Sequence, residues 1–140
     1  MAETPMELEP VPRDQWPDFC AAFAGSHRGW LVNVHRVATR RLDAGRDQAL
    51  AGAETLCREQ ALMEITDRPA GGGDGLRIAV AADAGERRLV VNQVVRLFDE
   101  RTAGGDFGLR MDCADGTSTL LEFRVSAEPE AVDGLAAGEL

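Results

Sequence analysis

The sequence predicts a mainly β (α+β) fold: one short N-terminal helix followed by about five antiparallel strands that form a small curved sheet or an SH3-like or Sm-like barrel. Three observations support this fold class. Apolar residues follow helical spacing near the N-terminus and alternate with polar residues in most segments downstream. Turn residues separate the alternating segments. One long apolar segment changes parity in its middle, which is typical of a bent strand in a closing sheet. An open five-stranded sheet with the helix on one face is the alternative.

The chain has the size and composition of one globular domain. Its 140 residues are 44% apolar and 28% charged, which supplies enough apolar material for a single core. Residues 1–12 contain three prolines and three glutamates without periodicity, so we expect a flexible acidic segment. The globular domain then covers residues 13–125, and residues 126–140 are expected to form a disordered acidic tail.

The opening helix is expected over residues 15–24. Its large apolar residues follow the spacing i, i+3, i+4 and i+7 and therefore share one face: Trp16, Phe19, Cys20 and Phe23. Asp14 is placed to cap the N-terminus of the helix, and Gly25 to end it in a left-handed conformation.

The spacing of apolar residues changes to two after Gly29. Val32 and Val34 continue the alternation that Trp30 begins, which predicts a first strand ending near Ala38. Residues 39–60 are harder to assign, because good helix formers are interrupted by glycines. They are expected to form a helix or a loop insertion.

Further strands are expected at three places: 61–67, 76–81 and 88–98. A glycine-rich link at 69–75 joins the first two of these, and a turn at 84–86 precedes the third. Parity slips at Asn92–Gln93, which predicts a bulge or strong bend there.

The final hairpin, residues 107–125, turns at Ala114–Gly116. A three-residue loop with Gly116 in a left-handed conformation pairs residues of one face in this order: Cys113 with Thr117, Met111 with Thr119, Leu109 with Leu121 and Phe107 with Phe123. A two-residue loop would instead oppose Leu109 with Glu122. The other face carries mostly polar residues: Arg110, Asp112, Ser118, Leu120, Glu122 and Arg124.

Three of these segments resemble a family of small bacterial proteins classed as a domain of unknown function. They are the Trp16-x-x-Phe19 helix, the strand from Arg88 to Phe98, and the hairpin from Gly108 to Phe123. The resemblance covers residues 13–124. It implies a bacterial, cytoplasmic setting and no catalytic residues, since the family has no established activity.

Charge patterning argues against nucleic acid as a partner. The chain has 15 arginines and lysines, 24 acidic residues and a net charge of −9, and none of the basic residues is lysine. The arginines are interspersed with carboxylates instead of forming a basic stripe. The chain also lacks an apolar segment long enough to span a bilayer, and its acidic N-terminus does not resemble a secretory signal. We therefore expect a cytoplasmic protein.

Neither the cysteines nor the histidines form a pattern typical of chemistry. Cys20, Cys57 and Cys113 lie in apolar contexts without a CxxC pair, which predicts buried free thiols. His27 and His35 lack the spaced partners of a metal site and are expected to be ordinary surface or capping residues. No metal, cofactor or enzymatic activity is expected.

Four polar residues lie within otherwise apolar strands and form the candidate ligand or interaction surface: Asn33, His35, Asn92 and Gln93. On a shared face they would line a shallow groove; an exposed sheet face and a bulge are the alternative. The sequence favours a non-enzymatic protein-interaction or regulatory module that uses a sheet edge or self-association. The alternatives are an Sm-like oligomeric nucleic-acid-binding protein and a small-ligand-binding domain.

Overall fold

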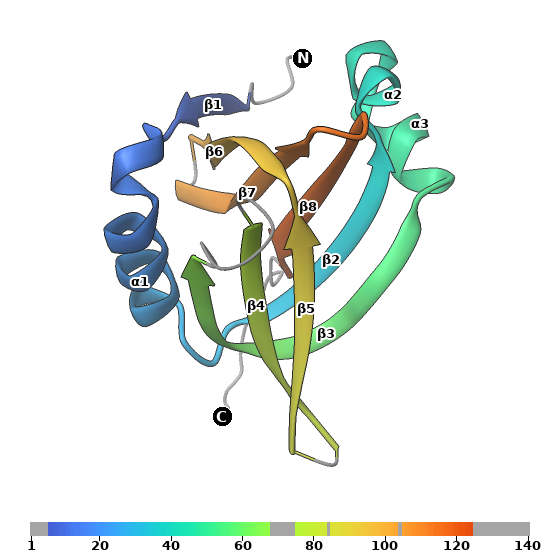
Figure 1. Cartoon of the computed structure of the whole chain (residues 1–140). Helices are drawn as coiled ribbons and strands as arrows, with labels where there is room; N and C mark the ends of the chain where they lie inside the picture. Colours follow the sequence, from blue (N-terminus) through green and yellow to red (C-terminus); the bar gives the residue numbers. More distant parts are fainter. Residues whose placement is uncertain (1–5, 68–74, 84, 104, 125–140) are drawn as a thin grey trace.

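The computed structural model describes residues 6–67, 75–83, 85–103 and 105–124, and their strands form one antiparallel sheet (Figure 1). The strands are β1 (Glu7–Pro10), β2 (Leu31–Ala38), β3 (Glu54–Asp67), β4 (Gly75–Ala82), β5 (Gly85–Asn92), β6 (Val94–Thr102), β7 (Gly105–Cys113) and β8 (Thr117–Phe123). Their order in the sheet is β1-β6-β7-β8-β2-β3-β4-β5. The helices are a 3₁₀ turn, η1 (Arg13–Gln15), then α1 (Trp16–Ser26), α2 (Thr39–Ala44) and α3 (Arg46–Ala51).

The mainly β class with an N-terminal helix is confirmed, but the expected strand number and the barrel are wrong. The sheet has eight strands and is open, because β1 and β5 are its two edges and do not pair with each other within the described ranges. One added strand comes from the segment expected to be flexible: residues 7–10 form β1 and pair with β6. Residues 126–140 and most of the glycine-rich link lie outside the described residues.

The expected single strand over residues 88–98 is two strands that belong to opposite ends of the sheet. β5 forms one edge, whereas β6 lies second from the other edge. Only Gln93 separates them, with a left-handed φ of 54°, and its carbonyl accepts a hydrogen bond from the Ala114 N–H at 2.9 Å. The bend was therefore correctly located. Because one residue joins the two ends of the sheet, the sheet must curve strongly (Figure 1).

α1 buries the face that its spacing predicts, but its ends differ from the prediction. Trp16, Cys20 and Phe23 are buried in the main core. Asp14 lies in η1 instead of capping the helix, and the helix continues through Gly25 to Ser26. The left-handed glycine is Gly29, with a φ of 90°, which turns the chain toward β2.

Residues 39–60 contain α2, α3 and the first half of β3, so the strand expected to begin at Ala61 begins at Glu54. The two short helices cover part of the face of the sheet that points away from the main core, called here the second face. A small apolar cluster forms there. It contains Val37, Ala49 and Leu120 with Leu42, Leu50 and Ala53 against them. This cluster buries Leu120, the apolar exception on the polar face of the last hairpin.

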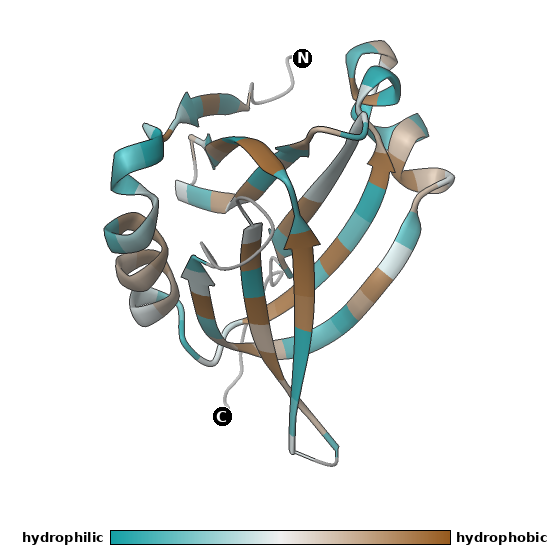
Figure 2. Ribbon diagram, in the orientation of Figure 1, coloured by the Kyte–Doolittle hydropathy of each residue, from teal (hydrophilic) through white to brown (hydrophobic). Residues whose placement is uncertain are grey.

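The final hairpin has the predicted three-residue turn. Gly116 is left-handed, with a φ of 89°, and the register pairs Leu109 with Leu121 and Met111 with Thr119. Leu109, Met111 and Leu121 are fully buried in the main core, which α1 covers at one end. Brown and teal bands alternate along most strands in Figure 2, as expected where apolar and polar side chains face opposite sides of a sheet. Within the described ranges, no helix has the length and apolar character needed to cross a membrane.

Candidate functional site

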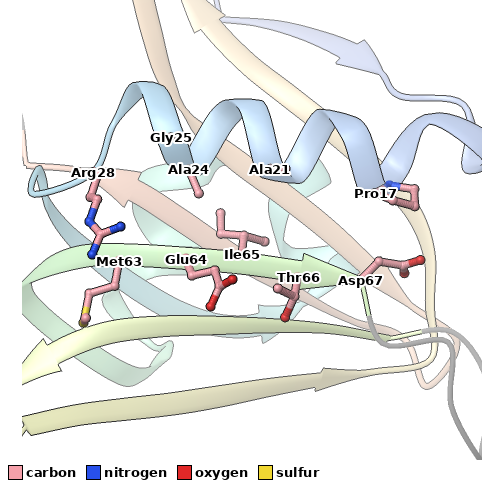
Figure 3. Close-up of a pocket in the computed structure, with 10 residues that line it drawn as sticks. All are labelled: Pro17, Ala21, Ala24, Gly25, Arg28, Met63, Glu64, Ile65, Thr66 and Asp67. Carbon is pink, nitrogen blue, oxygen red and sulfur yellow. The ribbon is translucent and has the colours of Figure 1, made fainter.

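A groove of about 520 Å³ runs between α1 and the C-terminal half of β3 (Figure 3). The two elements run in opposite directions along it, with Arg28 near Met63 at one end and Pro17 near Asp67 at the other. The lining residues are Pro17, Ala21, Ala24, Gly25, Arg28, Met63, Glu64, Ile65, Thr66 and Asp67. This volume lies within the range of ligand-binding clefts.

The helical wall of the groove is built from small residues. Pro17, Ala21 and Gly25 recur every fourth residue and therefore lie along one side of α1. Ala21 and Gly25 are exposed, and a Cβ atom added at Gly25 would meet no atom within 4 Å. The groove stays open because these residues place no long side chain in it.

The strand wall of the groove is a sheet edge. The C-terminal half of β3 pairs with β4 on one side. On the other side, pairing with β2 ends at Ala61, and the last backbone hydrogen bonds join Leu62 to Gly29 and Trp30, both at 2.8 Å. Among the residues that the structure describes, no strand continues the pairing past Leu62. Residues 63–67 therefore offer backbone N–H and C=O groups to an added strand.

Opposite charges lie toward the two ends of the groove. Arg28 is exposed where α1 ends, and Glu64 is exposed on β3. The Asp67 side chain is only 10% exposed, and its Oδ2 lies 3.6 Å from Nη1 of Arg13. Its Oδ1 is buried and accepts no hydrogen bond from any described residue. The Arg28 end of the groove thus suits an acidic group, and the Asp67 end suits a basic group or a hydrogen-bond donor.

Similarity to known proteins does not identify this groove. No family model, curated protein or solved structure matches the chain. Within the described ranges, no three His, Cys, Asp or Glu side chains are grouped so that they would hold a metal ion. The function is therefore inferred from the geometry of the site.

Two of the residues singled out by the sequence, Asn33 and His35, lie half-buried on the second face of β2. Oδ1 of Asn33 accepts the backbone N–H of Glu59 at 2.8 Å, where β3 is irregular and Glu59 has a φ of 50°. Nδ1 of His35 lies 3.3 Å from Oγ1 of Thr55, and its Nε2 lies 3.8 Å from Oε1 of Glu122. Both side chains therefore contact neighbouring strands.

The other two, Asn92 and Gln93, are exposed at the corner between β5 and β6. Asn92 is opposite Gly75 in the register of β4 and β5. No contact among the described residues joins this pair to Asn33 and His35. The four residues thus lie at two places, neither of which lines the α1–β3 groove.

A charge cluster that the sequence does not predict lies on the second face of the sheet. Arg46, the first residue of α3, donates hydrogen bonds to both oxygens of Glu100 at 3.0 and 3.2 Å and to Oε2 of Glu122 at 2.7 Å. Gly108 of β7 is opposite Glu100 of β6 on one side and opposite Glu122 of β8 on the other, so it lies between the two glutamates. A side chain at Gly108 would collide with the carbonyl oxygen of Leu121. No spacing signal in the sequence links residues so far apart.

Burial and ion pairing oppose each other in this cluster. Glu100 is fully buried, and burial raises the pKa of its carboxyl group although Arg46 acts to lower it. Burial alone would lower the pKa of Arg46, but its hydrogen bonds and charge contacts with Glu100 and Glu122 raise it. The cluster therefore holds α3 against the sheet through ion pairs in which each charge compensates the burial of the other.

His27 is the C-cap residue of α1, which is one of the two positions expected from the sequence, but it is buried and does not lie at the surface. Its ring lies 4.5 Å from the ring centroids of both Phe23 and Phe123, which also stack on each other at 5.5 Å. Its Nδ1 lies 2.7 Å from the carbonyl oxygen of Phe23 and its Nε2 lies 2.9 Å from Oδ2 of Asp106. These two contacts tie the end of α1 to β7.

All three cysteines are free thiols, as expected. Cys20 and Cys57 are buried, and Cys113 is half-buried. Burial raises the pKa of the Cys20 thiol to about 12 and also raises the pKa of Cys57 and Cys113. Thiols with raised pKa values are poor nucleophiles at neutral pH.

Proposed function

We propose that this protein is a non-enzymatic protein-interaction module that binds an extended segment of a partner protein. The segment adds as a strand to residues 63–67 of β3, in the groove beside α1 (Figure 3). The observation that supports this proposal is that the groove coincides with an edge of the sheet that has no strand partner among the described residues. Strand addition gains main-chain hydrogen bonds, and the groove selects the side chains.

The groove indicates the chemistry of the bound segment. Five strand residues span about 16 Å at ~3.3 Å per residue, so a segment of similar length fits beside residues 63–67. The wall formed by the small residues Ala21 and Gly25 leaves room for side chains of the bound segment. A carboxylate fits next to Arg28, and a basic side chain or a hydrogen-bond donor fits next to Asp67 at the other end of the groove.

Nucleic-acid binding has less support. Arginines on the strands or directly after them each lie within 4.0 Å of a carboxylate oxygen: Arg36, Arg88, Arg96, Arg101, Arg110 and Arg124. Their charge is thus partly neutralised within the protein. A small ligand would also fit the volume of the groove, but it would not use the free strand edge.

Peptide selection tests the proposal. The full chain is immobilised and screened against a displayed library of random peptides, and binding of an enriched synthetic peptide is then measured by fluorescence anisotropy. Gly25→Leu fills the groove from α1, where there is open space. Replacing glycine within a helix also stabilises it, by up to about 1 kcal/mol. We therefore expect this variant to remain folded and to bind the peptide at least about tenfold more weakly.

Ala22→Leu is the matched control, because Ala22 is exposed on the same helix but does not line the groove. It should bind the peptide as the wild type does. Amide hydrogen exchange distinguishes strand addition from binding of a small ligand, because only an added strand newly protects those amides of residues 63–67 that do not point toward β4. The proposal is wrong if no peptide is enriched, or if Gly25→Leu binds the enriched peptide as tightly as Ala22→Leu.

A further inference from the structure

A second edge of the sheet, β5, has features that suit pairing with a second copy of the chain. β5 is the last strand in the sheet order and pairs with β4 through residues 85–92. On its other side, the part of the chain that the structure describes contributes no paired strand. An edge of this length exposes a row of backbone donors and acceptors.

The two faces of β5 differ in polarity. Leu89 and Val91 point into the main core and are buried. Arg88, Val90 and Asn92 alternate with them and are exposed. Val90 is 40% exposed and lies on that face between the exposed polar residues Arg88 and Asn92.

Side-chain chemistry selects one register for antiparallel pairing of β5 with itself. With Val90 at the twofold axis, Val90 is opposite Val90 of the second copy, Leu89 is opposite Val91, and Arg88 is opposite Asn92. Residues opposite each other in an antiparallel pair share a face, so apolar groups meet apolar groups on the core side, and a guanidinium meets an amide on the outer side.

Neighbouring registers are less favourable. Centring the pair on Arg88 places two like charges directly opposite each other, and centring it on Leu89 places Arg87 opposite Val91. In the Val90 register, Arg88 also keeps its ion pair with Glu86 of the same strand, at 2.6 Å. The charges on this edge therefore do not oppose pairing.

We propose that the chain forms a symmetric homodimer by antiparallel pairing of the two β5 edges, centred on Val90. The interface is isologous, because each copy contributes the same strand, and the two sheets become continuous. This surface is separate from the α1–β3 groove, since β4 lies between β3 and β5. Dimer formation and peptide binding can therefore fail independently.

Sedimentation velocity of the full chain over a range of concentrations tests the dimer. The wild type should approach twice its 15.0 kDa mass as concentration rises. Val90→Arg and Val90→Glu each place two like charges at the twofold axis, so each should weaken the dimer at least about tenfold. An equimolar mixture of the two variants places Arg opposite Glu and should restore the dimer.

Val95→Arg is the matched control, because Val95 is a 54% exposed valine on β6, outside the proposed interface. It should dimerise as the wild type does, and circular dichroism checks that all variants are folded. A wild type that stays monomeric overturns the proposal. So does a Val90→Arg variant that dimerises normally, or a mixture of folded variants that fails to restore the dimer.

Discussion

Arg46 and Glu100 form an ion pair that attaches α3 to the sheet. Glu100 is fully buried, and Arg46 donates hydrogen bonds to both of its oxygens. The net stabilisation by such a pair is small, because desolvation of both charges offsets their attraction. Removing one partner is costly, since the other charge stays buried without compensation.

Arg46→Met should lower the free energy of unfolding by about 3–5 kcal/mol at pH 7. The loss should shrink in acid. Without Arg46, the pKa of Glu100 in the folded protein rises further above its usual value of 4.5, so the folded state binds a proton that the unfolded state does not. Protonation of Glu100 therefore stabilises the folded Arg46→Met variant as the pH falls through the pKa of the folded state toward 4.5. Urea unfolding over a pH series measures the effect.

Two further variants check that the buried charge is the cause. Adding Glu100→Gln to Arg46→Met should recover part of the loss at pH 7. Arg36→Met removes an arginine whose partner, Glu54, is exposed, and should cost at most about 1 kcal/mol. A loss in Arg46→Met that does not change with pH would contradict the role assigned to Glu100.

At the scale of the element, local patterns predicted the structures that depend on local interactions. Helical spacing located the buried face of α1, and parity fixed the register of β7 with β8. β1 was missed because its sequence, ELEP, has a single large apolar residue, Leu8, and all four residues are exposed, so that only pairing with β6 makes it a strand. The α1–β3 groove was also missed: Ala21 and Gly25 show only that α1 has small residues, and the free edge of β3 depends on where β2 ends.

α2 and α3 are expected to open as one local unit. They attach to the sheet through a small apolar cluster and the Arg46 contacts, separate from the main core. Leu50→Ala should therefore raise amide exchange in residues 39–51 by about tenfold, equivalent to ~1.4 kcal/mol, and leave the strands protected. Leu97→Ala, in the main core, should instead cost about 2–5 kcal/mol and raise exchange throughout. Uniform exchange in Leu50→Ala would show that these helices are not a separate unit.

At the scale of the whole molecule, the sheet joins parts of the chain that are far apart in sequence. Leu8 pairs with Glu100, and Val32 pairs with Phe123, so both ends of the described chain lie within one sheet. Closing such long loops costs entropy before any contact compensates for it. Sheets with many non-local pairs fold in milliseconds to seconds, slower than helical bundles. We expect this range for the present chain.

The order of strand pairing should follow the cost of loop closure. Pairing of β7 with β8 closes only a three-residue turn. Pairing of β1 with β6 closes a loop that contains most of the chain. Gly116→Ala strains the left-handed turn, which has a φ of 89°, and should mainly slow folding because the hairpin forms early. Val11→Ala, directly after β1 and partly buried against the core, should mainly speed unfolding. Stopped-flow fluorescence of the two tryptophans, Trp16 and Trp30, over a urea series separates the two rates. If Gly116→Ala speeds unfolding and leaves the folding rate unchanged, the hairpin forms after the rate-limiting step, and a long-range pairing such as β2 with β8 must start the sheet.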